Sequence, residues 1–177
     1  MRRLRAVHGR QPGSIFRDAS TRDQQGAHFV TKAPPSDSMH TRAREVEREF
    51  SALEDSIARY RYLVELGERM PRLSQAEKSD ETRLPGCQFG LWILTDYDAQ
   101  RDVLRFRVDS DAKISRGLAA LLVRVLDGQP PAAIAGASLD FLDTIGLRGH
   151  LSANRTNGLS AMIEEIRARA EHYAGES

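Results

Sequence analysis

Apolar side chains recur at helical spacing in two neighbouring stretches of the chain. Over residues 46–53 they return at every fourth and third position, which predicts a helix that begins near Thr41 and buries one face. Asp55 has the side chain of an N-cap, so a second helix is expected to begin there and to end within residues 67–71, which contain a glycine and a proline. Residues 74–77 have the spacing of a capping box, but no long apolar run follows, so only a short turn of helix is expected.

The pattern changes to the two-residue period of a β-strand after residue 88. Alternation over residues 89–97 predicts one strand, and alternation over residues 103–109 predicts another. A polar turn at residues 98–102 joins them, so we expect an antiparallel hairpin with one covered face. The side chains that share a face are Phe89, Leu91, Ile93, Thr95 and Tyr97 in the first strand and Leu104, Phe106 and Val108 in the second.

Helical spacing returns over residues 111–127 and continues towards the C-terminus. Gly128 ends the first of these helices, and shorter helices are expected after Pro130-Pro131 and over residues 140–145. The last helix opens within residues 152–157 and keeps its apolar spacing. Helices before and after an antiparallel hairpin make an α+β sandwich, in which N- and C-terminal helices flank a small sheet.

Residues 1–38 lack this periodicity and differ in charge from the rest. They hold seven basic and three acidic side chains, a net charge of +4, whereas residues 39–177 have a net charge of −3. We therefore expect a disordered basic extension followed by a single domain over residues 39–177. Three interpretations of the extension stay open, namely a genuine tail, a targeting segment that its aspartates disfavour, and an over-extended gene start before Met39.

The composition excludes several classes of function. With 40% hydrophobic and 29% charged residues, the chain has no apolar run long enough to span a membrane, and the patterned domain lacks the basic excess of a nucleic-acid binder. We therefore expect neither a membrane nor a nucleic acid as partner. A single cysteine permits no internal disulfide, which fits the reducing cytoplasm, and supplies too few thiolates for a metal cluster. The histidines, at positions 8, 28, 40, 150 and 172, have no metal-ligand spacing, so no bound metal is expected.

The lone cysteine lies in the segment Leu84-Pro85-Gly86-Cys87-Gln88. Proline fixes φ and glycine adopts conformations that other residues avoid, so Pro85 and Gly86 shape a loop. A cysteine kept for packing usually lies within a helix or strand, whereas reactive groups are often presented on loops. From these residues alone, a packed thiol and a nucleophilic thiol both stay open. Sulfur transfer needs a thiolate and room for the incoming sulfur. A lowered pKa of the thiol assists it where the surroundings provide one.

Other polar residues are weaker candidates for chemistry. His150 invites a Cys87–His150 dyad for acyl transfer, but no third member or oxyanion motif accompanies it, and a surface histidine is the favoured interpretation. Arg155, near the start of the last helix, is either a solvated cation or a group that holds an anion or thiolate. We interpret Asp109-Ser110-Asp111 as a strand end and helix start, with Ser110 or Asp111 capping the helix, rather than as paired catalytic carboxylates.

Four segments occur in order between about Val46 and Ala170. They are Tyr62-Leu63-Val64-Glu65-Leu66-Gly67 with Pro71; Leu84-Pro85-Gly86-Cys87-Gln88 with Trp92; Asp109-Ser110-Asp111-Ala112 with Gly117-Leu118; and Gly146-Leu147, His150-Leu151, Arg155 and Asn157-Gly158-Leu159-Ser160-Ala161-Met162. Together they resemble the SufE family of sulfur acceptors for cysteine desulfurases. An ordered match of this length is far more specific than any one of its motifs.

The resemblance implies a fold, an activity and partners. The implied fold is the compact α+β fold shared with cluster scaffolds of the IscU type, whose additional cysteines this chain lacks. Cys87 is then the acceptor of a sulfane sulfur from the persulfide of a pyridoxal-phosphate-dependent cysteine desulfurase of the SufS or CsdA type. The sulfur passes on to an iron–sulfur scaffold, and its removal stimulates the desulfurase. The chain itself is expected to bind no cofactor and to have no independent turnover.

The expected site combines the loop and the resemblance. Cys87 is the persulfide carrier. The residues expected to shape its loop are Pro85, Gly86 and Gln88. The weaker candidates for supporting the thiolate or binding the partner are Asp111, His150 and Arg155.

Two positions depart from the usual pattern of the family. Gln88 is followed by Phe89-Gly90-Leu91-Trp92, where the family commonly continues Ser-Gln-Val-Trp, and Thr156 replaces a frequent serine. The added aromatic beside the thiol bears on partner choice and loop mobility. The competing hypothesis is a non-catalytic regulator that binds the desulfurase without carrying sulfur. A homodimer is compatible with the sequence under either hypothesis.

Overall fold

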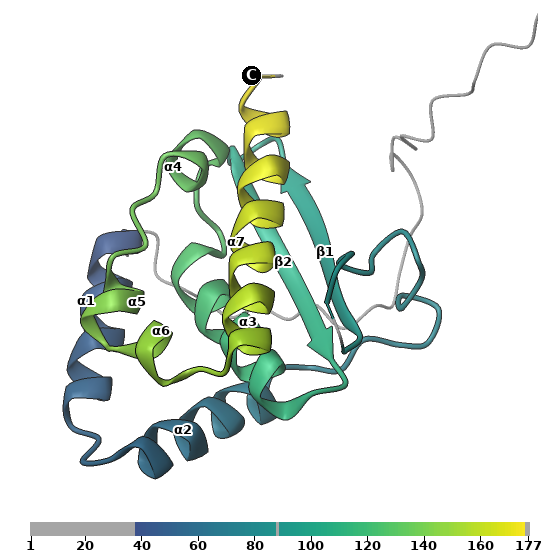
Figure 1. The fold of residues 1–177 in the computed structure, drawn as a ribbon. Coiled ribbons are helices and arrows are strands. Elements are labelled where there is room, and N and C mark those ends of the chain that lie inside the picture. The colour runs from purple at the N-terminus through teal and green to yellow at the C-terminus, as the bar shows by residue number, and fades with distance from the viewer. Residues whose placement is uncertain (1–37, 88, 176–177) are drawn as a thin grey trace, which may run out of the picture. The chain divides into compact units, whose positions relative to one another are not determined.

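The computed structural model of the chain describes residues 38–87 and 89–175, apart from the side chain of Arg148. Its elements are α1 (Met39–Ser51), α2 (Ser56–Arg69), β1 (Leu91–Asp98), β2 (Val103–Ser110), α3 (Lys113–Leu126), α4 (Pro131–Ala135), α5 (Phe141–Thr144), α6 (Leu147–His150) and α7 (Ala153–Ala174) (Figure 1). The expected α+β fold, a hairpin flanked by N- and C-terminal helices, is confirmed. The predicted extension lies outside the described residues except for Ser38, whose side chain accepts the Thr41 amide and caps α1.

The first two helices begin and end where their caps and apolar spacing place them. Val46 and Phe50 of α1 are buried, and the Asp55 carboxylate accepts the Ala58 amide at 2.7 Å, which caps α2. The capping-box segment that follows forms only a turn, in which the Ser74 amide donates to the Glu77 carboxylate at 2.8 Å. The expectations for this part of the chain are therefore confirmed.

The hairpin pairs β1 with β2 in antiparallel register, from Leu91 opposite Ser110 to Asp98 opposite Val103. The prediction that Phe89 belongs to the first strand is wrong, because the pairing begins only at Leu91 and Phe89 is 51% exposed. The last bond in register is the one from the Asp111 amide to the Gly90 carbonyl, and the chain bends at Phe89.

The core forms around α3, which packs against α1, α2, β2 and α7. Figure 1 shows α7 running past α3 and the hairpin, and the buried side chains of α7 (Leu159, Met162, Ile163, Ile166 and Ala170) supply that part of the core. Gly117 brings α3 directly against α2, because a Cβ at this position would overlap the Leu63 carbonyl. The sequence did not predict α6, a single helical turn in the link before α7.

A buried ion cluster ties the end of β2 to α3 and to the segment after α2. The fully buried carboxylate of Asp109 pairs with Arg72 at 3.1 Å, with Lys78 at 2.9 Å and with Arg116 at 3.2 Å. Burial alone raises the pKa of Asp109, but hydrogen bonds from Lys78 and the Ser110 amide, with the charge of Arg116, outweigh it and hold the pKa below its ordinary value.

The strand end predicted at Asp109-Ser110-Asp111 is confirmed, but the predicted side-chain cap of the following helix is wrong. The Ser110 hydroxyl accepts the Ala112 amide, and α3 begins without a side-chain cap.

Within the described residues, no helix combines the length and apolarity needed to cross a bilayer. The same residues contain no cluster of three or more His, Cys, Asp or Glu side chains arranged to hold a metal ion.

Candidate functional site

The loop that contains Cys87 rises from a short β-like base. The Leu84 amide donates to the Leu91 carbonyl at 2.8 Å, and the Ile93 amide donates to the Thr82 carbonyl at 2.9 Å. Residues 82–84 therefore lie antiparallel to the start of β1, with Arg83 opposite Trp92. Residues 85–90 connect these two anchored segments, and we call them the Cys87 loop.

The N-terminal side of the Cys87 loop is open. Pro85 and Gly86 are exposed, and Gly86 has a φ of +78°, a conformation that favours glycine. No atom lies within 4 Å of the position that a Cβ of Gly86 would occupy. This half of the loop thus has the space to change conformation without displacing a neighbour.

The C-terminal side of the loop is fixed at Gly90. Its carbonyl accepts the Ser110 hydroxyl at 2.8 Å and the Asp111 amide at 3.0 Å. A Cβ at Gly90 would overlap both the Trp92 ring and the Asp111 carboxylate, and Lys78 lies 4.8 Å from the centre of the same ring. Asp111 therefore lies beside the fixed end of the loop. Gln88, also expected to shape the loop, lies outside the described residues.

The Cys87 thiol is half-buried and packs against the hydrophobic core. It rests against α7 near Gly158, where a Cβ would lie 3.9 Å from the Cys87 Sγ. Burial raises the pKa of the Cys87 thiol above its ordinary value of 9.0, and the positive charge of Arg83 offsets part of this effect. At neutral pH the resting side chain is therefore mainly the thiol, the less reactive form.

Arg83 is the cation near the thiol that sequence reasoning missed. Arg83 precedes Cys87 by only four residues, but this spacing alone does not show that its charge acts on the thiol. Their relation depends on the pairing of residues 82–84 with β1, which turns the loop back. The signal was present as a cation immediately before the Leu-Pro-Gly-Cys segment.

Replacing Arg83 by alanine should raise the pKa of Cys87 further, because the cation that favours the thiolate is removed. We expect alkylation of Cys87 by iodoacetamide at neutral pH to slow by about threefold. This is the size of effect expected when one partly screened charge interaction is lost. Rates measured across a pH series check this result. Arg83→Lys keeps the charge and should behave like the wild type; equal rates for all three proteins would contradict the role of the charge.

Two other predicted site residues, His150 and Arg155, lie on either side of the point where α7 begins. Arg155 lies over the Tyr60 ring, 5.6 Å from its centre, and the Tyr60 hydroxyl donates to the backbone carbonyl of His150. The His150 side chain is exposed. In the part of the chain that the structure describes, no hydrogen bond joins His150 to Cys87, so the two do not form a dyad there.

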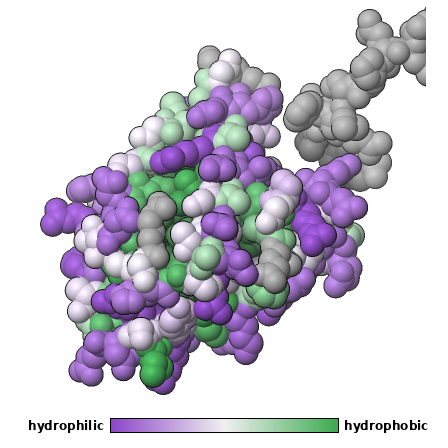
Figure 2. Space-filling view, viewed as in Figure 1, coloured by the Kyte–Doolittle hydropathy of each residue, from purple (hydrophilic) through white to green (hydrophobic). Residues whose placement is uncertain are grey.

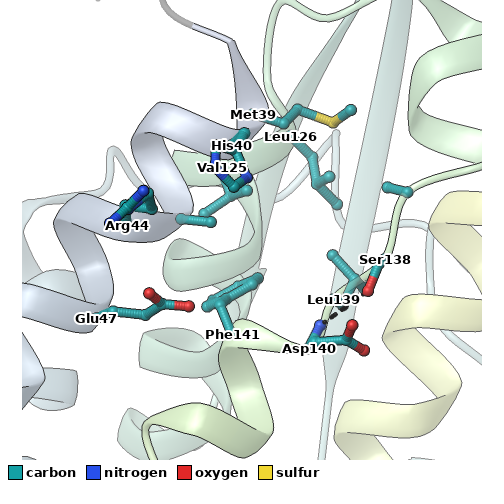
Figure 3. Close-up of a pocket in the computed structure, with 12 residues that line it drawn as sticks. Met39, His40, Arg44, Glu47, Val125, Leu126, Ser138, Leu139, Asp140 and Phe141 are labelled. Carbon is teal, nitrogen blue, oxygen red and sulfur yellow. Dashed lines mark hydrogen bonds between the residues drawn. The ribbon is translucent and has the colours of Figure 1, made fainter.

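One groove lies apart from the Cys87 loop. It has a volume of about 500 Å³ and lies between the start of α1, the end of α3 and the link from α4 to α5 (Figure 3). Its lining includes Met39, Arg44, Leu126 and Phe141, and none of its lining residues belongs to the Cys87 loop. The groove is therefore not part of the candidate site.

Comparison with known proteins gives a consistent family. The family model "SufE: Fe-S metabolism associated domain" matches residues 44–170. Uncharacterised SufE-like proteins of Rhizobium meliloti (strain 1021) and Rhizobium etli are each 36% identical over 126 residues, which is 70% of this chain and 90% and 85% of theirs. The Arabidopsis thaliana "SufE-like protein 1, chloroplastic/mitochondrial" is 31% identical over 138 residues, or 78% of this chain and 37% of that protein.

A solved structure supports the fold. The solution structure of a hypothetical protein from Thermus thermophilus matches with a TM-score of 0.62 at 20% identity, over 76% of this chain and 96% of the other. At this identity the likeness concerns the fold, and it agrees with the α+β arrangement of the hairpin and helices. The family match extends from within α1 into α7 and includes the whole Cys87 loop. The chain belongs to the SufE family of proteins associated with Fe–S metabolism.

Proposed function

We propose that the chain is a sulfur carrier that accepts a sulfane sulfur on Cys87 from a pyridoxal-phosphate-dependent cysteine desulfurase. It then delivers this sulfur for iron–sulfur cluster assembly. The observation that supports the proposal most is the placement of the chain's single cysteine on a loop with one fixed and one open side, inside a domain associated with Fe–S metabolism. We expect the transfer to take place in the cytoplasm.

The proposed transfer is a thiol–persulfide exchange that needs no external oxidant or reductant. The Cys87 thiolate attacks the terminal sulfur of the desulfurase persulfide and forms a new S–S bond. The S–S bond of the donor breaks, and the donor cysteine leaves as a thiolate. The terminal sulfur moves with its proton, so one persulfide and one thiolate are present before and after the step.

The resting geometry protects the thiol from indiscriminate reaction. Cys87 is half-buried with a raised pKa, so attack requires the Sγ to leave the core and its surroundings near Gly158. Rotation at Gly86 allows this movement because its surroundings are open, whereas the contacts of Gly90 hold the other end in place. Leaving the core also removes the main cause of the raised pKa, which increases the fraction of reactive thiolate.

The chain is not expected to turn over a substrate by itself, nor to bind a cofactor. Its contribution is to clear sulfur from the desulfurase, which frees that enzyme for its next cycle. The acceptor that follows is an iron–sulfur scaffold, to which Cys87 passes the sulfur by the same exchange.

Incubation with an active desulfurase and free cysteine tests this function. Under non-reducing conditions the intact mass of the chain should increase by one sulfur atom, and digestion should locate the increase in the peptide that contains Cys87. Dithiothreitol should reverse it. An unchanged mass beside a desulfurase that forms its own persulfide would contradict the proposal.

One observation favours the alternative of a regulator that binds the desulfurase without carrying sulfur. The half-buried, mainly protonated state of Cys87 is also what a structural thiol would show. The two functions differ in whether stimulation of the desulfurase needs the sulfur atom of Cys87.

A further inference from the structure

Trp92, the single tryptophan of the chain, lies where the Cys87 loop joins the hairpin. It is the second residue of β1, and in the register of the hairpin it is directly opposite Asp109 of β2. Its side chain is half-buried. Small groups of apolar side chains are usual on a mostly hydrophilic face such as that shown in Figure 2, whereas the contacts of the Trp92 ring are specific.

The Trp92 ring occupies the space beside Gly90, the last residue of the Cys87 loop. A Cβ on Gly90 would overlap the outer edge of the indole at Cη2 and Cζ3, so the ring packs against a residue that has no side chain. Gly90 is buried, and its carbonyl accepts the Ser110 hydroxyl at 2.8 Å and the Asp111 amide at 3.0 Å. Ring packing and hydrogen bonding therefore act on the same glycine.

Lys78 connects this ring to the buried ion cluster. Its Nζ lies 2.9 Å from the Asp109 carboxylate and 4.8 Å from the centre of the Trp92 ring. The Lys78 side chain is only 13% exposed, and a cation shielded from water attracts an aromatic ring more strongly than one at an open surface. A series of contacts thus runs from Asp109 through Lys78 and Trp92 to Gly90.

The fixed end of the loop limits where the thiol can lie. Gly90 follows Cys87 by three residues, and three residues of extended chain span at most about 11 Å. At the other end of the loop, the surroundings of Gly86 are open. The resting position of the Cys87 Sγ near Gly158 therefore depends on the end that Trp92 contacts.

We propose that Trp92 is a positioning residue for the sulfur transfer, whose ring, held by Lys78, fixes the Gly90 end of the Cys87 loop and so directs the thiol. This inference rests on the proposed function. With Gly90 fixed, the loop moves by rotation on its Gly86 side, and the Sγ leaves the core along a restricted path. A reacting group that is held in orientation reacts faster with a bound partner than one that must search for it.

Trp92→Leu tests this role, because leucine keeps an apolar side chain but removes the ring. In the free protein the thiol should leave the core more often, so alkylation of Cys87 by iodoacetamide should become about threefold faster or more. The pKa of Cys87 read from these rates across a pH series should fall towards its ordinary value of 9.0, while the charges beside the loop, Arg83 and Asp111, are unchanged. Sulfur transfer at saturating desulfurase should instead become about tenfold slower, because the thiol is no longer directed.

Tyr97→Leu is the matched control. Tyr97 also belongs to β1, but its ring stacks on Tyr173, with the ring centres 5.0 Å apart, at the end of the strand away from the loop. Neither rate should change in this variant. Trp92→Phe keeps an aromatic face for Lys78 and should restore both rates towards those of the wild type. Circular dichroism sets a temperature at which every variant is folded.

The outcomes separate the positioning role from the sulfur-carrier function. Alkylation of Trp92→Leu at the wild-type rate, with an unchanged pH profile, would overturn the positioning role even where the wild type gains sulfur. Sulfur transfer by Trp92→Leu as fast as that of the wild type would overturn it too, as would equal changes in Tyr97→Leu. A wild type that binds the desulfurase without gaining sulfur would overturn the carrier function, whereas faster alkylation of Trp92→Leu would still support the hold of the ring on the loop.

Discussion

Replacement of Cys87 by serine is expected to abolish sulfur loading and stimulation of the desulfurase while binding persists. Serine is close to cysteine in size, and the Sγ position has room beside Gly158, so the fold and binding to the desulfurase should be retained. The hydroxyl, unlike a thiolate, cannot take a sulfur from a persulfide at neutral pH. The experiment measures desulfurase turnover as a function of added chain, together with binding by calorimetry.

Thr156→Ser is the matched control for this substitution. The Thr156 hydroxyl donates to the Ser152 carbonyl at 3.2 Å within the first turn of α7, and serine can make the same bond. Its stimulation should equal that of wild type. Full stimulation by Cys87→Ser would contradict the carrier function and support the regulator instead.

The largest effect on stability is expected from Asp109→Ala. Removing this carboxylate leaves the buried Arg116 and the nearly buried Lys78 without their counter-charge, and breaking one side of a buried pair costs about 3–5 kcal/mol. Urea denaturation followed by circular dichroism measures the loss. Asp96→Ala removes a mostly exposed carboxylate, 3.9 Å from Arg107, and as the control it should cost less than about 1 kcal/mol.

The same carboxylate should make stability depend on pH in the acidic range. Because the pKa of Asp109 is lower in the folded protein than its ordinary value of 3.8, its contribution is fully present above that value. The contribution is lost as the pH falls through the lowered pKa of the folded state. The difference in unfolding free energy between wild type and Asp109→Ala should therefore shrink as the solution is acidified below 3.8. A constant difference would show that the ionised carboxylate is not what stabilises this part of the fold.

Much of the fold could be predicted because its signals are local. The N-cap at Asp55, the buried spacing of Val46 and Phe50, and the alternation of β2 each depend on residues close in sequence. The error at Phe89 arises where the backbone departs from the local pattern of side chains. Phe89 continues the alternation of the strand, but the chain bends at this residue, and the bonds in register end at Gly90.

The candidate site was predictable in part for the same reason. Pro85 and Gly86 mark the Cys87 loop in the sequence, since each acts on its own backbone. The nearness of Gly158 to the thiol and the effect of Arg83 depend on how α7 and residues 82–84 pack, which spacing along the chain does not reveal. The buried role of Asp109 was missed likewise, because its three cations come from separate segments.

The central claim, that sulfur moves from a desulfurase to Cys87, is tested most directly by weighing both proteins in one reaction. The desulfurase is loaded with persulfide, separated from free cysteine, and mixed with an equal amount of the chain without reductant. We predict that the desulfurase loses the mass of one sulfur atom while the chain gains it, and that Cys87→Ser leaves the desulfurase loaded. A desulfurase that keeps its sulfur in the presence of the wild-type chain, although the two proteins bind, would contradict the claim.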